Sequence, residues 1–514
     1  MTVSQFVPRP ADPGRSTADE DVDVVIVGAR CAGAAAAVPL ARAGRNVLVL
    51  DRVKFPADTL SSHTMLPVGV SELLHMGALP GILALSPTRC RRLRVTVDAE
   101  TPREMRIEET FTPIEGIDYA LSVPRDLHDK VLVDTMRAAG ARIRERATVV
   151  GLTWQAGRVS GVRYVDEDGR ERVVRCRLVM GADGRHSTVA RLVGAAEPYR
   201  SSANGRAGVV RYLDDQPPDP DEADVVCQWR DGAHLAFGFP GTPIGRYTLF
   251  FMGSPAEAAM ARRDPDAYWA MKMEHHPGVA RRLRHATNMS AFRGTDQLVA
   301  YFRPCSGPGW VLIGDSGHFK DPSLGQGMRD AMWAGRHAAT AAMRHLDDLD
   351  ELDLAMRRFE HDRDQECLPA YYFGNGEALL RPTPRPFKAF IESARDDVDR
   401  PFTSVGQRIK TPQQLLRSRL VVGGVARTLL VADDRRGFLR EMAGEGRVQA
   451  AIVRALIHSR TRFRSTIPAD GAENDLASAP ASVPPAVVAT SDDDVPPAGD
   501  RPTVVAREAE AVAS

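Results

Sequence analysis

The sequence predicts a mixed α/β fold, in which a parallel sheet flanked by helices is interrupted by a mostly antiparallel sheet and followed by helices. Three short apolar runs, Val24–Val27, Val47–Leu50 and Trp310–Ile313, suit parallel strands that are buried on both faces. Between the second and third runs, residues 201–299 alternate in short segments that Gly and Pro punctuate, which is typical of antiparallel strands. From residue 346 the periodicity is helical.

Length and composition are those of an ordinary globular chain. At about 100–200 residues per domain, 514 residues predict two to four domains, and the apolar (43%) and charged (26%) fractions are near average usage. No apolar run is long enough for a membrane-spanning helix, and the first 21 residues lack the apolar core of a secretory signal. Six cysteines without a CxxC pair favour neither a metal site nor a disulfide framework, so we expect a reduced, cytoplasmic protein.

A strand–helix–strand unit near the N-terminus carries the first candidate ligand site. Gly28 follows the first strand, Gly33 lies in the Ala-rich helix after it, and Asp51 ends the second strand. Gly28 permits a tight turn, Gly33 allows close helix–strand packing, and the amides at the helix start suit a pyrophosphate. A carboxylate at Asp51 is placed to bind a ribose 2′-hydroxyl. The unit therefore predicts dinucleotide binding, with a purely structural glycine turn as the alternative.

Arg30 departs from this pattern, because it stands where a middle glycine is usual. Its side chain could obstruct the approach of the backbone to a pyrophosphate. Alternatively, its guanidinium could itself pair with phosphate. The sequence leaves both interpretations open.

Two further glycine–aspartate motifs follow predicted parallel strands. One is Gly181-Ala182-Asp183-Gly184-Arg185-His186-Ser187, and the other is Gly314-Asp315-Ser316-Gly317-His318, which continues from Asp321-Pro322 to Gly327-Met328. Both aspartates are expected at the carboxyl edge of the sheet, where open α/β sheets bind ligands. For each aspartate taken alone, capping a helix or a turn is the alternative role.

With the three motifs in this order, residues 22–345 resemble the FAD-dependent monooxygenases of the aromatic-hydroxylase (group A flavoprotein) type, within the glutathione-reductase-like superfamily. The sequence is also similar to the geranylgeranyl-reductase branch. The resemblance implies a Rossmann-like domain of glutathione-reductase type, FAD as the cofactor, and NADPH or NADH as a transient reductant. It implies that Asp183 and Gly184 contribute to both nucleotides, and that Asp315 binds the ribityl or ribose portion of FAD.

The turn before a predicted helix at 326–345 resembles the one whose amides contact the flavin pyrimidine in the family. A helix N-terminus there would stabilise the anionic reduced flavin, and a glycine hinge is the alternative. Arg125, which begins a predicted helix, matches an Arg or Gln that reaches FAD in the family, and a surface arginine at a helix start is the alternative. Val149 matches the strand that meets the adenine. The cofactor-binding candidates are Gly28, Arg30, Ala32, Gly33, Asp51, Arg52, Arg125, Val149, Asp183, Gly184, Asp315, Pro322, Gly325, Gln326, Gly327 and Met328.

In the resembling monooxygenases, reduced FAD captures O2 as a C4a-hydroperoxide and passes one oxygen atom to an electron-rich substrate. The resemblance therefore implies an enzyme of secondary metabolism that hydroxylates or epoxidises an aromatic or polyketide-like small molecule. The protein supplies a dry pocket, orientation and a base for a phenol. His63, in the loop Asp58–His63 after the second strand, is the catalytic candidate, with a solvated or capping loop histidine as the alternative.

Other functions stay open. A prenyl reductase of geranylgeranyl type would use the same flavin without O2, and the Lys54–Pro56 run and the loop after it do not exclude it. A flavin-dependent halogenase is disfavoured, because Phe237–Pro240 is the nearest stretch to the WxWxIP signature of that family. A non-catalytic FAD-binding interaction protein would bind FAD without turnover driven by NAD(P)H.

These predictions divide the chain into a disordered N-terminus, an FAD-binding domain, a substrate-binding sheet domain, a helical region and a disordered tail, at residues 1–21, 22–200 with 300–345, 201–299, 346–466 and 467–514. The tail has nine acidic residues against Arg501 and Arg507 and no aromatic residue, so it cannot build a core. Arg400–Arg464 is basic without interleaved aromatics, which favours a solvated helical face over nucleic-acid binding. The oligomeric state is left open.

Overall fold

The computed structural model describes residues 18–202, 206–378, 381–395, 400–412, 414, 419–431 and 434–461. The acidic tail, and residues 1–17 of the predicted disordered N-terminus, lie outside these ranges. Glu20–Asp21 form strand β1, which pairs in parallel with β11 (Glu171–Arg175). Ordered structure therefore begins before the predicted boundary at residue 22, because this short segment completes the edge of a sheet.

The first main sheet has the strand order β20-β21-β12-β2-β3-β8. Its strands are Ser306–Gly307, Trp310–Leu312, Leu178–Gly181, Val24–Val27, Val47–Leu50 and Arg142–Arg144. All neighbouring strands are parallel except the edge strand β20. Every residue of β2, β3 and β12 is buried, as expected for strands covered on both faces.

Helices α4 (Arg125–Ala138) and α9 (Gly327–Met343) both pack on α1 (Cys31–Arg42), and all three share the core of this sheet. A second layer, with strand order β1-β11-β10-β9, contacts it through β10 (Arg158–Val165) and continues to β9 (Thr148–Gln155). The predicted fold class, a mixed α/β protein with a Rossmann-like parallel-sheet domain, is confirmed.

The second main sheet has the order β18-β14-β17-β16-β15-β5-β6. Its strands are Arg293–Thr295, Ala207–Asp214, Arg246–Gly253, His234–Pro240, Val225–Asp231, Arg92–Val97 and Met105–Thr110. It is antiparallel except between β5 and β15. Strands β5 and β6 come from outside the predicted range 201–299, which is therefore too narrow. Periodicity cannot reveal this difference, since the β5–β15 pairing joins distant segments.

The two faces of this sheet have different neighbours. On one face, helices α6 (Pro255–Arg263), α7 (Pro265–His275) and α8 (Pro277–Arg282) share a core with strand residues such as Phe251. The other face presents Phe237, Phe239 and Phe250, which pack with Leu60 and Leu66 from the first domain. The aromatic face is thus turned toward the parallel-sheet domain.

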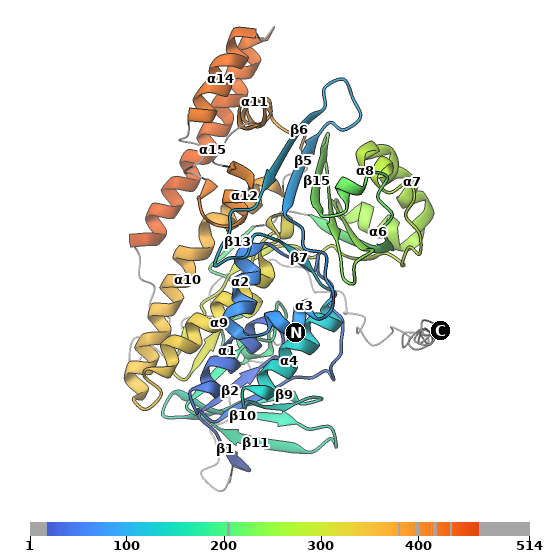
Figure 1. Ribbon diagram of the computed structural model, residues 1–514. Coiled ribbons are helices and arrows are strands. Elements are labelled where there is room, and N and C mark those ends of the chain that lie inside the picture. Colours follow the sequence, from blue (N-terminus) through green and yellow to red (C-terminus); the bar gives the residue numbers. More distant parts are fainter. Residues whose placement is uncertain are drawn as a thin grey trace, which may run out of the picture. The chain divides into compact units, whose positions relative to one another are not determined.

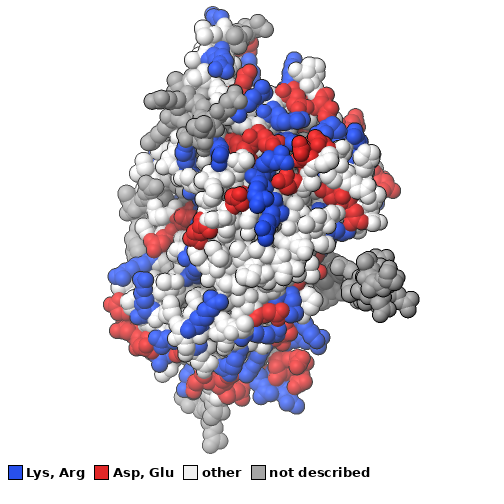
Figure 2. Space-filling view, in the orientation of Figure 1, with Lys and Arg blue, Asp and Glu red and all other residues white. Residues whose placement is uncertain are grey.

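The C-terminal helices are α10 (Leu349–Glu377), α11 (Arg385–Ala394), α12 (Pro401–Gly406), α14 (Arg419–Val431) and α15 (Arg435–Thr461). Helix α10 packs on α9, and α11 packs on β6 (Figure 1). Figure 2 shows Lys and Arg interspersed with Asp and Glu on the face in view. None of the helices in the described ranges is long and apolar enough to cross a membrane.

Shorter elements connect these layers. They are β4 (Thr64–Met65), α2 (Pro67–Met76), α3 (Leu79–Leu83), β7 (Leu121–Ser122), α5 (Thr188–Leu192), β13 (Arg200–Ser202), β19 (Ala300–Phe302) and β22 (His318–Phe319). Three 3-10 turns also occur, at η1 (Pro220–Glu222), η2 (Gly314–Ser316) and η3 (Pro322–Leu324).

Close packing between α1 and α9 depends on Gly335. A Cβ at this position would overlap the carbonyl oxygen of Ala32 and lie 3.0 Å from the amide nitrogen of Ala36. We expect Gly335→Ala to lower the free energy of unfolding by about 1–3 kcal/mol, as overpacking of a core does. Gly446→Ala is the matched control in α15, because no atom lies within 4 Å of its Cβ position. Denaturant titration of both variants checks this, and an unchanged Gly335→Ala midpoint would contradict the packing argument.

Candidate functional site

The three sequence motifs meet at one edge of the parallel sheet. Strand β12 pairs with β2 on one side and with β21 on the other, and all three run in the same direction. Their carboxyl ends therefore place Gly28, Asp183 and Asp315 on neighbouring loops. Gly28 has a φ of 106°, and a Cβ there would overlap the carbonyl oxygen of Ala182. Only glycine thus allows the first loop to lie against the second, at the edge where such sheets bind ligands.

Asp51 holds the first loop in shape. Its Oδ2 accepts a hydrogen bond of 2.7 Å from the Ala29 amide, and its Oδ1 accepts one of 3.0 Å from the Val53 amide. Each carboxylate oxygen keeps a second lone pair, which a ribose hydroxyl could use. Burial raises the pKa of this carboxyl. The neighbouring Arg52 is exposed.

Asp129 joins the two arginine candidates in a buried cluster. Its Oδ2 accepts from Arg30 Nη1 at 2.6 Å and from Arg125 Nη2 at 2.9 Å, and its Oδ1 accepts from Arg125 Nε at 3.0 Å. Oδ1 also lies 3.0 Å from Nδ1 of His128, whose pKa is lowered by burial. Two guanidiniums against one carboxylate leave a surplus positive charge beside the first glycine loop. Arg30 is therefore directed to α4, an outcome that the sequence did not indicate.

Asp183 caps helix α5. Its Oδ2 accepts from the amides of Thr188 and Val189 at 2.7 and 3.1 Å, and its Oδ1 accepts from the hydroxyls of Ser187 and Ser316 at 2.6 and 3.1 Å. The carboxylate is thus engaged by the protein itself, which is the capping role that the sequence left as the alternative. Its neighbour Gly184 has a φ of 78° and open space where a Cβ would be.

Asp315 contrasts with Asp183. Its side chain is half-buried in η2, and no donor among the described residues hydrogen-bonds its carboxylate. Its backbone oxygen accepts from the Tyr301 hydroxyl at 2.5 Å, which fixes the loop. Burial raises the pKa of this carboxyl, while the charges of Arg185, Arg125 and Lys320 oppose that shift. A partly desolvated, unpartnered carboxylate at this edge suits the hydroxyl donors of a ribityl chain.

The turn before α9 is open on one side. Gly325 has a φ of 62°, and no atom lies within 4 Å of the Cβ position at Gly325 or Gly327. The intervening Gln326 is buried, with 3% of its surface exposed, and Met328 is buried in the core. Pro322 stands at the start of η3, and Val149 is a buried residue of β9. The bare backbone at the N-terminus of a 17-residue helix suits a ligand that carries partial negative charge.

His63 lies between the flavin-binding candidates and the aromatic face of the second sheet. Its side chain is fully buried, and its Nε2 hydrogen-bonds the hydroxyl of Tyr212 on β14. Its Nδ1 is buried without a hydrogen-bond partner in the described chain. The Ser61 hydroxyl accepts from the His63 amide at 3.0 Å and lies 3.9 Å from the Met328 sulfur. Burial lowers the pKa of His63 to about 3, so the imidazole is neutral.

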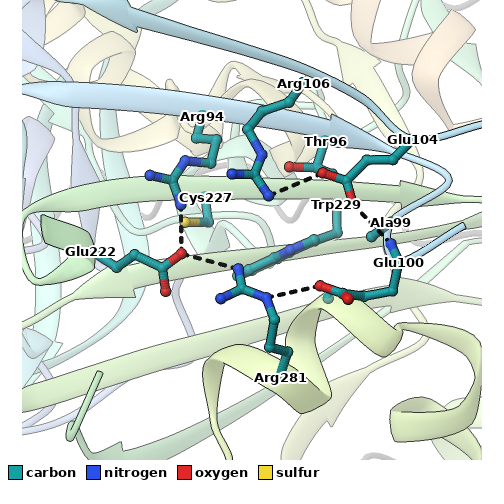
Figure 3. Close-up of a pocket in the computed structure, with 11 residues that line it drawn as sticks. Arg94, Thr96, Ala99, Glu100, Glu104, Arg106, Glu222, Cys227, Trp229 and Arg281 are labelled. Atoms are coloured by element: carbon teal, nitrogen blue, oxygen red, sulfur yellow. Dashed lines mark hydrogen bonds and ion pairs between the residues drawn. The ribbon is translucent and has the colours of Figure 1, made fainter. Parts of the chain in front are cut away.

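A separate surface pocket has a different character. Glu222 lies between Arg94 and Arg281, and Arg281 also pairs with Glu100 (Figure 3). The residues that line this pocket come from β5, β6 and the loop between them, β15, η1 and α8, and none belongs to the three glycine motifs. Because these charged groups form ion pairs with one another, we assign the pocket a structural role.

Taken together, the open glycine turns, the unpartnered Asp315 and the positive charge around Asp129 fit FAD, and the fold and site define an FAD-dependent oxidoreductase. The chain matches the model of the FAD binding domain family over residues 21–343, and it belongs to that family. The expected FAD cofactor is thus supported at the level of the family.

Several known proteins resemble this chain. It is 30% identical to the menaquinone reductase of Mycolicibacterium smegmatis over 335 residues, covering 62% of this chain and 75% of the relative. It is 26% identical to digeranylgeranylglycerophospholipid reductase 2 of Methanopyrus kandleri, covering 67% and 83%. The structure of a probable FAD-dependent monooxygenase from Pseudomonas aeruginosa superimposes with a TM-score of 0.55 at 19% identity, covering 76% and 100%. These proteins confirm the predicted resemblance to both branches.

Proposed function

We propose that this protein is an NAD(P)H- and O2-dependent monooxygenase that inserts one oxygen atom into an aromatic or polyketide-like molecule. The observation that carries the proposal is the buried, neutral His63. Its loop contacts Met328 through Ser61, its Nε2 bonds Tyr212 on the second sheet, and its Nδ1 has no hydrogen-bond partner in the described chain. Flavin chemistry alone needs no such group, whereas orienting a phenol needs a desolvated acceptor. The cytoplasmic location, the absence of nucleic-acid partners and the role in secondary metabolism stay predictions of the sequence.

Each candidate residue then has a specific task. Asp315 would accept hydrogen bonds from the ribityl hydroxyls, and the surplus charge of Arg30 and Arg125 would attract the pyrophosphate. The amides at the start of α9, from Gln326 to Met328, would hold the pyrimidine edge, where charge develops on reduction, while the Gly325 amide donates to the Pro322 carbonyl. Bound FAD, reduced by NADPH or NADH, supplies the activation of O2.

His63 would accept the proton or hydrogen bond of a substrate hydroxyl at Nδ1. The Tyr212 hydroxyl bonds Nε2. In the tautomer that carries its proton on Nε2, the Tyr212 oxygen accepts that proton's hydrogen bond and Nδ1 can accept from the substrate. Burial raises the pKa of Tyr212, so this hydroxyl stays protonated. Phe237, Phe239 and Phe250 would provide the apolar surface for the aromatic rings.

A second candidate function is the reduction of an isoprenoid double bond without O2. The identities to a menaquinone reductase and to a digeranylgeranylglycerophospholipid reductase favour it. The same apolar face would accept a prenyl chain, and His63 would then have no hydroxyl to orient. A non-catalytic FAD-binding protein remains the candidate from another class, and it predicts no turnover with NAD(P)H.

Replacement of His63 tests its role. We expect His63→Gln to retain FAD and to lower coupled product formation about 100-fold or more, the size of a lost acid–base group. Tyr212→Phe should give a smaller loss, because the imidazole stays in place and loses only its hydrogen bond at Nε2. The measurement is product formed per NADPH consumed. Equal yields from wild type and His63→Gln would remove His63 from the mechanism.

The reaction itself is tested with isotopically heavy O2. Purified protein with FAD, NADPH and heavy O2 is supplied with phenols, polyketide aromatics or a prenylated quinone. The masses of the products are measured by mass spectrometry. A product that gains one heavy oxygen atom supports the monooxygenase. A product that gains two hydrogen atoms, formed equally well without O2, would replace it with the reductase.

A further inference from the structure

The segment of residues 400–410 reaches the turn before α9 from outside the family-matched residues. Helix α12 lies within it, and all of its residues but Phe402 are buried. Gly406 contacts the first domain so closely that a Cβ would lie 2.9 Å from Leu66. The family model ends at residue 343, so this contact is an addition to the matched domain.

Arg408 holds both ends of the first turn of α9. Its Nε donates to Gln326 Oε1 at 3.0 Å, and its Nη2 donates to both oxygens of Asp330, at 2.7 and 3.0 Å. Its Nη1 donates to the backbone and side-chain oxygens of Glu366 at 2.6 and 3.1 Å. The Gln326 amide in turn donates to the Gly406 carbonyl at 3.0 Å. Gln326, between the two open glycines, therefore has both ends of its amide fixed by this segment.

The segment is anchored at its other side on the second sheet. Gln407 exchanges two hydrogen bonds with the backbone of Thr112, at 2.5 and 3.0 Å. The amide and hydroxyl of Thr403 donate to Glu109 of β6 at 2.8 and 2.9 Å. Residues 400–410 thus connect the second main sheet to the N-terminus of α9.

The charged side chains around Arg408 are mostly buried and pair with one another, and burial lowers the pKa of Lys320 to about 7. Arg408, Arg329 and Lys320 face Asp330 and Glu366, and the side chains of Arg329, Lys320 and Asp330 are each less than 10% exposed. The neighbouring His318 is neutral, because burial and these cations lower its pKa. In such surroundings a single charge acts with little solvent screening.

We propose that Arg408 is a positioning residue of the flavin site, which orients the Gln326 turn toward the flavin pyrimidine and favours the reduced, anionic flavin by its charge. This inference rests on the FAD site of the proposed function, though not on the reaction. It adds to the FAD site a residue of the C-terminal helical region, which lies beyond residue 343, where the family match ends.

The experiment measures FAD affinity and the flavin midpoint potential, not turnover. We expect Arg408→Gln to weaken FAD binding at least tenfold and to lower the ratio of affinities for reduced and oxidised FAD about tenfold, which corresponds to about 30 mV. Arg408→Lys should keep the potential and recover only part of the affinity, because an ammonium lacks the guanidinium fork. Arg436→Gln, exposed on α15, is the control.

Arg408→Gln with the affinity and potential of the control would overturn the inference. If this variant does not fold, Gln326→Ala tests the inference instead. It removes the hydrogen bonds that join Gln326 to Arg408 and Gly406 and leaves the ion pairs of Arg408 intact. Gln326→Ala should then weaken FAD binding, and unchanged binding would overturn the inference. Failure of the wild-type protein to bind FAD would instead reject the proposed function.

Discussion

Asp315→Ala should purify as a folded protein that has lost FAD. The Asp315 carboxylate has no hydrogen-bond partner in the described chain, so its removal breaks no internal hydrogen bond, and we expect the variant to fold. Each charge-assisted hydrogen bond to a ribityl hydroxyl contributes about 1.5–3 kcal/mol, so losing two weakens binding at least 100-fold. Flavin content and titration of the apo-protein with FAD measure this effect.

Asp183→Ala is the matched control for Asp315→Ala, because it removes a carboxylate from the loop after the neighbouring strand. Asp183 accepts two amides and two hydroxyls of the protein. Its loss should lower the free energy of unfolding by about 1–2 kcal/mol, as for a helix cap. Full flavin content in folded Asp315→Ala would show that FAD is held elsewhere.

Asp129→Ala should be the most destabilising of these substitutions. It leaves Arg30 and Arg125 without their carboxylate, and the Asp129 side chain is fully buried. Breaking a buried ion pair on one side costs about 3–5 kcal/mol. Asp134→Ala on the same helix, where the side chain is 52% exposed, should change stability by less than about 0.5 kcal/mol. Urea unfolding of the apo-proteins compares the two variants.

The difference in stability between wild type and Asp129→Ala should depend on pH. Burial alone would raise the pKa of Asp129, but Arg125, His128 and Arg30 hold it well below its usual value. A depressed pKa contributes stability above the unfolded pKa of about 3.9, and that stability is lost as the pH falls further. The difference between wild type and Asp129→Ala should therefore be constant near neutral pH and shrink below about pH 4. A difference that grows on acidification would contradict this assignment.

The sequence predicted the parts of the site that depend on local pattern. The strand–helix–strand unit with Gly28 and Asp51, and the loops bearing Asp183 and Asp315, stand at the expected edge because parallel strands fix where their carboxyl ends lie. It could not distinguish Asp183, which caps α5, from Asp315, which is unpartnered. That difference depends on which donors the folded chain brings within reach.

Long-range partners were missed for the same reason. Asp129 looks like an ordinary polar residue on a helix, and Tyr212 like one more residue of an alternating strand. Arg408 lies in a segment that no motif marks. Each acquires its role from a contact between distant segments, and neither periodicity nor spacing carries that information. The β5–β15 pairing was hidden in the same way.

The most direct test of the account is anaerobic titration of the purified, FAD-reconstituted protein with NADPH and NADH, followed through the visible flavin spectrum. We predict one FAD per chain, bleaching of the flavin band by at least one of the two nucleotides, and recovery of the band when O2 is admitted. A chain that binds no flavin, or a bound flavin that neither nucleotide reduces, would contradict the assignment as an NAD(P)H-dependent flavoenzyme.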